Sequence, residues 1–305
     1  NKMIGLFGKP RDKNSRFFTR STGWPSYFGL KPEGEEFERL AEEQEYYADI
    51  AASVQEVLEE AVVNLANEAH RITGLDKLCL AGGVALNSVA NWKIHELTPF
   101  KDIYIQPASS DAGGALGAAL ALDHIAFKQE RKFIMDYAYW GAEYSSQEIE
   151  ESVKKSGLSY EHVFDEEKLL DIVSDKLKDG KVIGWFQGRF EWGPRALGNR
   201  SILADPRRPE MKDIVNTKIK FREPYRPFAP SVLAEYAKDF FEITDAENHY
   251  PARFMLYVVP VKKEKQGIVP AITHVDGSAR PQLVFKETFP RYWKLIDWFR
   301  QKTGV

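Results

Sequence analysis

Apolar residues recur every three or four positions between Glu35 and Thr73, with charged residues between them. Val54, Leu58 and Val62 keep this spacing, which is the period of an amphipathic α-helix. Gly74 follows directly, and glycine commonly ends a helix. The pattern predicts one long helix from Glu35 to about Thr73, preceded by an irregular loop over residues 9–34 that is rich in Lys, Arg, Gly and Pro.

Short apolar segments then alternate with glycine turns and helical patterns. We expect, in chain order, a strand at Lys77–Ala81, a helix from Val84 to about Leu97, a strand at Asp102–Gln106 and an Ala-rich helix to about Phe127. Such alternation predicts an α/β layer with parallel strands, in which ligands bind beyond the carboxyl ends of the strands.

Residues 128–145 interrupt this alternation with mixed charges and aromatic side chains. We place a domain boundary there and divide the chain into residues 1–140 and 141–305, the second part being α/β as well. Its predicted helices are Ser146–Ser156, Glu166–Lys178, Glu210–Ile219 and a final aromatic helix near Arg291–Lys302. Its predicted strands are Leu158–Val163, Val182–Phe186 and Phe254–Val261.

Both ends of the chain indicate a fragment of a longer protein. Residues 1–8 have the pattern of a strand already in progress, and the last three residues follow an aromatic helix directly.

The composition is that of a soluble globular protein. The chain has 305 residues, of which 43% are hydrophobic and 29% charged, enough for two domains of ordinary size. Its net charge of −3 argues against a nucleic-acid or membrane-surface partner, because both need a basic face. No apolar stretch approaches the roughly 20 residues that span a bilayer. The one cysteine, Cys79, excludes an internal disulfide framework, indicates a reducing cytoplasm, and is expected to be a buried small hydrophobe.

Positive charge is concentrated in residues 187–209, QGRFEWGPRALGNRSILADPRRP. The arginines of this run are Arg189, Arg195, Arg200, Arg207 and Arg208. Arginine offers a planar fork of donors suited to phosphate oxygens, and glycine lets backbone amides approach an anion closely. Interleaved aromatic and glycine residues indicate a partly buried loop, where unpaired guanidinium groups are costly. Arg195 and Arg200 are the first expected phosphate contacts, with Ser201 as a further donor; alternatively, Glu191 and Asp205 pair with the arginines in a structural network.

Two glycine turns follow the first two predicted strands. Gly82 and Gly83 precede a helix in which Asn87 lies one turn along, a position from which it can reach a nucleotide hydroxyl. The second turn contains Asp111, Gly113 and Gly114. Asp111 is a candidate to bind a metal or to position a cation at a phosphate. The alternatives are glycines that serve packing only and an Asp111 that caps its helix, but two such turns on successive strand–helix units favour a shared nucleotide cleft.

Two later loops add polar groups. Lys220, Arg222 and Arg226 stand among prolines in KFREPYRPFAP, and His274 and Arg280 stand in ITHVDGSARPQ. A loop histidine can bind substrate or transfer a proton, although it is more often a surface residue. The remaining histidines have no spacing typical of a metal pair, so a complete transition-metal site cannot be built from this chain alone.

With these residues in view, the chain resembles the O-carbamoyltransferase family, which includes nodulation-factor and antibiotic-tailoring carbamoyltransferases. The motifs EWGPRALGNRSILADPR, AGGVALN, SSDAGGALGAAL, REPYRPFAP and THVDGSARPQ carry the resemblance from about Leu78 onward. It implies a partial actin/sugar-kinase-like (ASKHA) domain followed by a YrdC-like α/β domain, truncated at its end. It also implies a cytoplasmic enzyme that converts carbamoyl phosphate and ATP to carbamoyl adenylate and transfers the carbamoyl group to an acceptor hydroxyl.

The resemblance assigns roles by motif. Gly82, Gly83 and Asn87, with Gly113 and Gly114, would contact the nucleotide, and Asp111 would ligate an iron-type metal, with Mg²⁺ accompanying ATP. The carbamoyl phosphate and ATP pocket would be lined by Arg189, Arg195, Arg200, Ser201, Lys220, Arg222 and Arg226, joined by His274 and Arg280. Arg195, Arg200 and His274 are the expected catalytic residues.

Family members carry two metal-binding histidines in an amino-terminal half that this chain lacks, so we expect little or no carbamoyl transfer by the chain alone. A tRNA threonylcarbamoylation enzyme and a non-catalytic nucleotide-binding module are the alternative functions. The sequence leaves the oligomeric state open, and a homodimer is one alternative. The acceptor is also open among sugar, aminoglycoside, β-lactam and lipo-oligosaccharide hydroxyls, because variable loops build such pockets.

Overall fold

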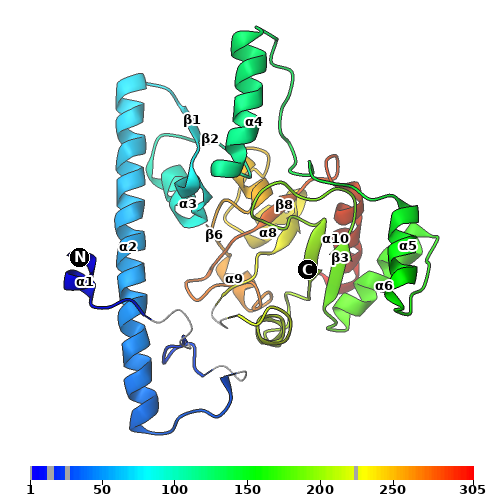
Figure 1. Ribbon diagram of the computed structural model, residues 1–305, viewed down its shortest axis with the longest axis horizontal. Coiled ribbons are helices and arrows are strands. Elements are labelled where there is room, and N and C mark those ends of the chain that lie inside the picture. The colour runs from blue at the N-terminus through cyan, green and yellow to red at the C-terminus, as the bar shows by residue number, and fades with distance from the viewer. Residues whose placement is uncertain (1, 12–16, 25–27, 223–225) are drawn as a thin grey trace.

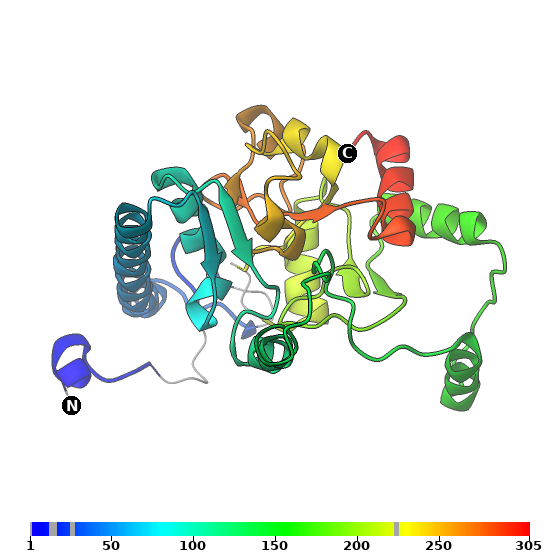
Figure 2. The ribbon, with the colours of Figure 1, turned by 90° about the horizontal axis from the view of Figure 1, so that it is seen from above.

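The computed structural model describes residues 2–11, 17–24, 28–222 and 226–305 (Figure 1). The chain mixes helices and strands. Figures 1 and 2 show the long helix α2 (Glu35–Thr73) at one side of the molecule, and α5 (Ser146–Ser156) with α6 (Glu166–Lys178) at the opposite side. In the described part of the chain, no helix combines the length and the apolar composition needed to cross a bilayer.

The predicted long helix is confirmed. α2 ends at Gly74, whose backbone is left-handed (φ 66°) and whose N–H donates to the carbonyl oxygen of His70, as expected of a glycine that ends a helix. The expected irregular segment before it is largely confirmed among its described residues, and Phe18 and Phe28 pack there against Ala41 of α2.

The expectation of a strand at residues 1–8 was wrong. Lys2–Phe7 form a short helix, α1, in which no residue is buried. No described strand lies beside it to complete a ladder, whereas a helix satisfies backbone groups locally, for example through Gly8 N–H donating to Ile4 over 3.0 Å.

The strand–helix alternation of the first half is confirmed. Its elements are β1 (Lys77–Leu80), η2 (Gly83–Leu86), α3 (Ser88–Leu97), β2 (Asp102–Ile105), α4 (Asp111–Ala121) and η3 (Leu122–Ala126). β1 and β2 are parallel, with Lys77 opposite Asp102. The predicted helix from Val84 to Leu97 is divided in two at Asn87, which has an extended backbone.

The small parallel sheet buries one face. Ile103 and Ile105 of β2 are buried and alternate with exposed Asp102 and Tyr104. Cys79 lies on the uncovered face of β1 and is exposed, so the expectation of a buried cysteine was wrong. The reason is that this sheet is covered on one side only, so alternate residues of its strands face outward.

The second half contains short paired strands and several helices. Its strands are β3 (Ile183–Phe186), β4 (Arg200–Leu203), β5 (Ser231–Leu233), β6 (Val259–Pro260), β7 (Ser278–Ala279) and β8 (Gln282–Val284). Its other helical elements are α7 (Glu210–Ile214), η4 (Val215–Ile219), η5 (Ala234–Tyr236), α8 (Ala237–Phe240), η6 (Tyr250–Phe254), α9 (Lys263–Gln266) and α10 (Pro290–Thr303). β3 pairs with β4 and β6 with β7 in antiparallel fashion, and β5 pairs with β8 in parallel.

The helix predictions of this half hold, and two strand predictions do not. Residues 158–163 are not in a strand, and Leu158 and Tyr160 are exposed beyond α5, with no described strand alongside. The run 254–261 pairs only at Val259–Pro260, because η6 occupies its start and Met255 is left-handed. Most apolar residues of this run are buried without forming a long strand. A short apolar run alone does not show whether the segment is a strand or another buried conformation.

The hydrophobic cores connect the two halves of the chain. The core around Ile103 and Phe100 also contains Leu197 and Leu256, and Trp92 of α3 belongs to a core built mainly from residues 237–283. α6 and α10 share a third core. The ASKHA-like and YrdC-like assignments, and the division near residue 140, stay predictions.

Candidate functional site

A cavity of about 410 Å³ lies in the second half of the chain. Apolar side chains form most of its wall, among them Phe228, Leu233 and Leu295. Its cationic lining residues are Arg195, Lys220, Arg222, Arg280 and Arg300, the last of which forms an ion pair with Asp297. Asp205 supplies the one carboxylate side chain among the lining residues that the structure describes. Three loops, those before β4, after η4 and after β7, therefore bring together cations that are far apart in the sequence.

Desolvation and like-charged neighbours lower the pKa values of three of these cations. Desolvation, followed by the neighbouring charge of Arg280, lowers the pKa of Arg195 to about 10. Desolvation and the charge of Arg222 lower the pKa of Arg280, and the same two causes lower that of Lys220. Each guanidinium or ammonium group thus repels the next, which is the arrangement expected of a site for a polyanion.

Arg195 connects the cavity to the first glycine turn. Its Nη2 donates a hydrogen bond of 2.8 Å to the carbonyl oxygen of Leu86. Its Nε and Nη1 are buried, and no described residue accepts from them. Buried N–H groups without partners are costly, so Arg195 has two donors for a ligand oxygen.

Of the donors predicted at Ser201 and in the loop 220–230, some line the cavity and one does not. Arg222 donates from Nε to the Asn216 Oδ1 atom over 2.6 Å. Ser201 lines the cavity, and its Oγ accepts from the Gly198 N–H over 2.9 Å. Arg226 is exposed and does not line the cavity, although its carbonyl oxygen accepts from Asn216. The predicted loop 220–230 also includes residues 223–225, which lie outside the described residues.

Two arginines of the run lie away from the cavity lining. The Arg200 guanidinium lies 3.5 Å from the ring centroid of Phe186 and 4.0 Å from that of Phe190, and it donates to three backbone carbonyl groups. Arg189 forms a half-exposed ion pair with Glu143 over 3.3 Å. Both were predicted to contact phosphate, and the structure does not bring them to the same cavity as Arg195.

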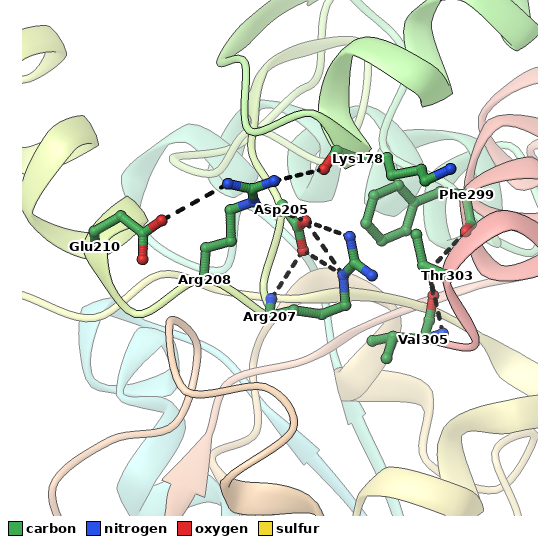
Figure 3. A network of polar contacts seen from close by, with 8 residues as sticks. All are labelled: Lys178, Asp205, Arg207, Arg208, Glu210, Phe299, Thr303 and Val305. Atoms are coloured by element: carbon green, nitrogen blue, oxygen red, sulfur yellow. Dashed lines mark hydrogen bonds and ion pairs between the residues drawn. The ribbon is translucent and has the colours of Figure 1, made fainter.

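The structural-network alternative holds for the end of the run. The Asp205 carboxylate is fully buried, and Arg207 donates to both of its oxygens, the shortest bond being 2.7 Å (Figure 3). Arg208 lies 3.5 Å from Asp205 and also donates to the carbonyl oxygen of Lys178. Glu191, in contrast, accepts hydrogen bonds from three backbone N–H groups of the loop. Arg207 and Arg208 are therefore structural.

The two glycine turns lie side by side. The Gly82 N–H donates to the carbonyl oxygen of Ser109 over 2.7 Å. A Cβ atom at Gly113 would lie 2.4 Å from the carbonyl oxygen of Ala108, so a side chain is excluded there, whereas Gly83 and Gly114 have open space. Close packing explains the glycine at position 113.

Asn87 and Asp111 have specific local positions. Asn87 caps α3 by accepting from the Ala90 N–H, and its amide pairs with that of Gln55. Asp111 is exposed in the first turn of α4, and Ser110, not Asp111, occupies the N-cap position. Over residues 2–11, 17–24, 28–222 and 226–305, no group of three or more His, Cys, Asp or Glu residues is arranged to hold a metal ion.

His274, predicted to join the pocket, does not line the cavity and instead belongs to a hydrogen-bonded chain that the sequence did not reveal. Its Nδ1 lies 2.9 Å from Ser278 Oγ, which in turn lies 2.6 Å from Asp276 Oδ1. The DGS triplet after His274 was the available signal, because Asp and Ser in a glycine turn often bond to nearby polar groups.

Comparison with known proteins places the motifs in a family context. Residues 31–120 match the family model described as carbamoyltransferase N-terminus, and residues 174–305 match the one described as carbamoyltransferase C-terminus. The glycine turns lie in the first match, and the whole arginine run and the cavity cations lie in the second.

Curated relatives agree with these matches. Nodulation protein NolNO of Sinorhizobium fredii is 44% identical over 262 residues, which are 85% of this chain and 38% of the relative. Nodulation protein NolO of Bradyrhizobium diazoefficiens is 43% identical over 259 residues, covering 85% of this chain and 47% of the relative. An uncharacterized protein of Synechocystis is 45% identical over 282 residues, covering 84% and 45%. The chain thus spans less than half the length of these relatives.

Proposed function

The chain belongs to the carbamoyltransferase family, and we propose that its cationic cavity binds carbamoyl phosphate and ATP for an ATP-dependent O-carbamoyl transfer. The observation that carries the proposal is the cluster of Arg195, Lys220, Arg222 and Arg280 around one cavity. Four neighbouring cations match two phosphorylated reactants, whose combined charge no neutral pocket would hold.

The proposed reaction forms carbamoyl adenylate. In this reaction carbamoyl phosphate, ATP and one water molecule give carbamoyl adenylate, pyrophosphate and inorganic phosphate. The free Nε and Nη1 groups of Arg195 would bind phosphate oxygens, and Arg280 would offset the charge of the departing pyrophosphate. Ser201 supplies a hydroxyl at the same wall. The acceptor hydroxyl would then lose its proton and take the carbamoyl group from the adenylate, with AMP as the leaving group.

The apolar part of the cavity gives room for a nucleoside beside the phosphates. Phe228, Leu295 and Phe299 line it together with the cations, which is the composition typical of small-molecule sites, with few polar groups in an apolar wall. We place the proposed activity in the cytoplasm, where both phosphorylated reactants are available.

The described residues do not fit a metal site at Asp111. That carboxylate is exposed, and it has no set of His, Cys, Asp or Glu residues around it in the described part of the chain. The proposal therefore routes no step through a metal.

The proposal is tested by carbamoyl-phosphate-dependent exchange of pyrophosphate into ATP, measured with the full-length protein. Arg195→Ala and Arg280→Ala should abolish the exchange, because each removes a cation that lines the cavity. Arg208→Ala is the matched control, since Arg208 lies in the same run but binds Asp205 and Lys178 instead. Unchanged exchange in both cavity variants would refute the phosphate assignment. Absence of any exchange in the unaltered protein would favour a non-catalytic nucleotide-binding module.

A further inference from the structure

Lys220 is the one lysine among the described residues that line the cavity. The residue is also exposed to solvent, so a molecule that enters the cavity can reach it. Its Nζ atom lies 5.9 Å from the ring centroid of Phe228, and the Arg222 guanidinium lies 4.9 Å from the centroid of the same ring. Phe228 and Arg222 both line the cavity as well. These contacts place the Lys220 amine at the cationic wall.

The backbone of this loop presents two cations to the same wall. Lys220 follows the last residue of η4, and its N–H donates to the Val215 carbonyl oxygen over 2.9 Å. The Arg222 N–H donates to the Asn216 carbonyl oxygen over 3.0 Å. Phe221 between them is left-handed (φ 48°) and largely exposed, a conformation that is rare for a bulky residue and that is found most often at functional sites. The bend at Phe221 lets both neighbours line the cavity while its own ring faces solvent.

The Lys220 amine has no counter-charge in the described part of the chain. Its Nζ makes no ion pair or hydrogen bond there, and the one carboxylate side chain that lines the cavity, Asp205, is bound by Arg207 and Arg208. Burial, followed by the charge of Arg222, lowers the pKa of Lys220. A larger fraction of this amine is therefore neutral at neutral pH than in an ordinary lysine, and the neutral amine is a nucleophile.

The cations beside Lys220 also attract an electrophile with which the amine can react. Carbamoyl phosphate is a mixed anhydride, so its carbonyl carbon carries phosphate as a leaving group. In the proposed function, its phosphate is held by Arg195, which has two free N–H groups, and by the other cavity cations. Holding the phosphate there brings the adjoining carbonyl carbon into the same cavity as the amine, where the encounter of the two groups becomes effectively unimolecular.

We propose that Lys220 is a covalent modification site, carbamoylated on Nζ by carbamoyl phosphate that is bound in the cavity. This inference rests on the proposed function, because it takes the phosphate of that molecule to lie among the cavity cations. A bond forms between Nζ and the carbonyl carbon, and the bond from that carbon to the phosphate oxygen breaks. The phosphate keeps the electron pair and leaves as HPO₄²⁻ with the proton that the nitrogen loses. The product is an uncharged urea, so the cavity loses one cation and binds phosphorylated ligands less tightly.

The test incubates the full-length protein with carbamoyl phosphate in the absence of ATP and follows each lysine by peptide mass spectrometry. Lys218 is the matched internal control, because it is exposed two residues earlier and does not line the cavity. We expect Lys220 to react about tenfold faster than Lys218, and pyrophosphate, which competes for the same cations, to reduce this difference. Cyanate forms the same urea without a phosphate to hold it in the cavity, so it should show a much smaller preference for Lys220.

The consequence of the modification is tested by the exchange of pyrophosphate into ATP. Preincubation with carbamoyl phosphate, removed before the assay, should progressively lower the exchange rate of the unaltered protein. Lys220→Arg keeps a positive charge, but its guanidinium group is not a nucleophile, so this variant should retain whatever exchange rate it begins with.

Three results would overturn the inference and leave the proposed function intact. They are equal rates of modification at Lys220 and Lys218, the same preference for Lys220 with cyanate as with carbamoyl phosphate, and an equally fast loss of exchange in Lys220→Arg. Absence of exchange in protein that was never preincubated would instead contradict the proposed function itself.

Discussion

Arg195 donates a hydrogen bond from Nη2 to the carbonyl oxygen of Leu86 over 2.8 Å. This bond joins the arginine run of the second half to the turn that follows Gly82 and Gly83 in the first half. An oxyanion that takes up the two unpartnered N–H groups of Arg195 would therefore lie beside the glycine turn. Two motifs that look like separate anion sites in the sequence are neighbours in the structure.

The cation cluster should cost stability when no anion is bound. Burial and then the charge of Arg222 lower the pKa of Arg280, and burial and then the charge of Arg280 lower the pKa of Arg195. Arg280→Met keeps the volume but removes this repulsion, so we expect the free energy of unfolding to rise by about 1 kcal/mol, as is usual when a functional site is relieved of its charge. Urea denaturation without phosphate measures this.

The same variant should lose its response to anions. Inorganic phosphate or pyrophosphate should raise the melting temperature of the unaltered protein and raise that of Arg280→Met much less, because ligands stabilise only the state that binds them. Arg291→Met, which removes an exposed pair with Glu166, is the control and should keep the full response. A marked loss of stability in Arg280→Met would contradict the idea of unfavourable charge in the cavity.

Asp205 should be one of the most stabilising charged residues of the chain. Its carboxylate is fully buried and is bound by Arg207 and Arg208 (Figure 3). Asp205→Asn leaves the Arg207 guanidinium without its counter-charge, and breaking a buried ion pair in this way costs about 3 kcal/mol. Glu166→Gln, which breaks the exposed pair with Arg291, should cost less than about 1 kcal/mol. Equal losses in urea denaturation would argue against a buried network.

Gly198 should not tolerate a side chain. Its φ is +105°, and a Cβ atom would lie 2.6 Å from ring atoms of both Phe289 and Tyr292, which are buried. Gly198→Ala should cost about 3 kcal/mol through backbone strain and overpacking together. Gly184→Ala is the matched control, since nothing lies within 4 Å of its Cβ position, and thermal unfolding should show almost no change. Similar melting temperatures for the two variants would contradict the packing at Gly198.

Local signals explain which elements the sequence could predict. α2 ends where Gly74 stands, α5 begins at the Ser145 and Glu148 capping box, and α6 begins at the Asp165 cap. Each of these depends on side chains within one turn of the helix end. The failed strands, 158–163 and 254–261, depended on a partner strand elsewhere in the chain, and no local pattern reveals whether one is there.

The candidate site shows a similar limit. Five arginines of one run carry the same charge, yet only Arg195 of them lines the cavity, while Arg207 binds Asp205 and Arg200 lies between two phenyl rings. Composition predicted an anion site in this region. It could not predict which partner each guanidinium group binds. Some partners are distant in sequence, and among nearby residues several side chains could serve equally well.

A pair of buried histidines predicts loss of stability in acid. His95 of α3 and His249 have ring centroids 4.8 Å apart, and each has a buried Nδ1 that no described residue contacts by a hydrogen bond. Trp92 and Tyr257 pack against both rings. Protonating either imidazole therefore places a charge in an aromatic environment, close to the other histidine.

The pH range follows from the pKa of His95, which burial, then His249 and Lys101, lower from 6.5 to about 4. The unfolded chain takes up the proton first, so the contribution of His95 to the free energy of unfolding should be constant above pH 6.5 and fall between 6.5 and 4, by about 1 kcal/mol after allowing for solvent screening. His95→Phe preserves the stacking on Trp92 and should flatten this fall, whereas the exposed His162→Phe should leave it unchanged. Urea denaturation at several pH values measures the slopes, and equal slopes in the unaltered protein and His95→Phe would exclude His95 as the titrating group.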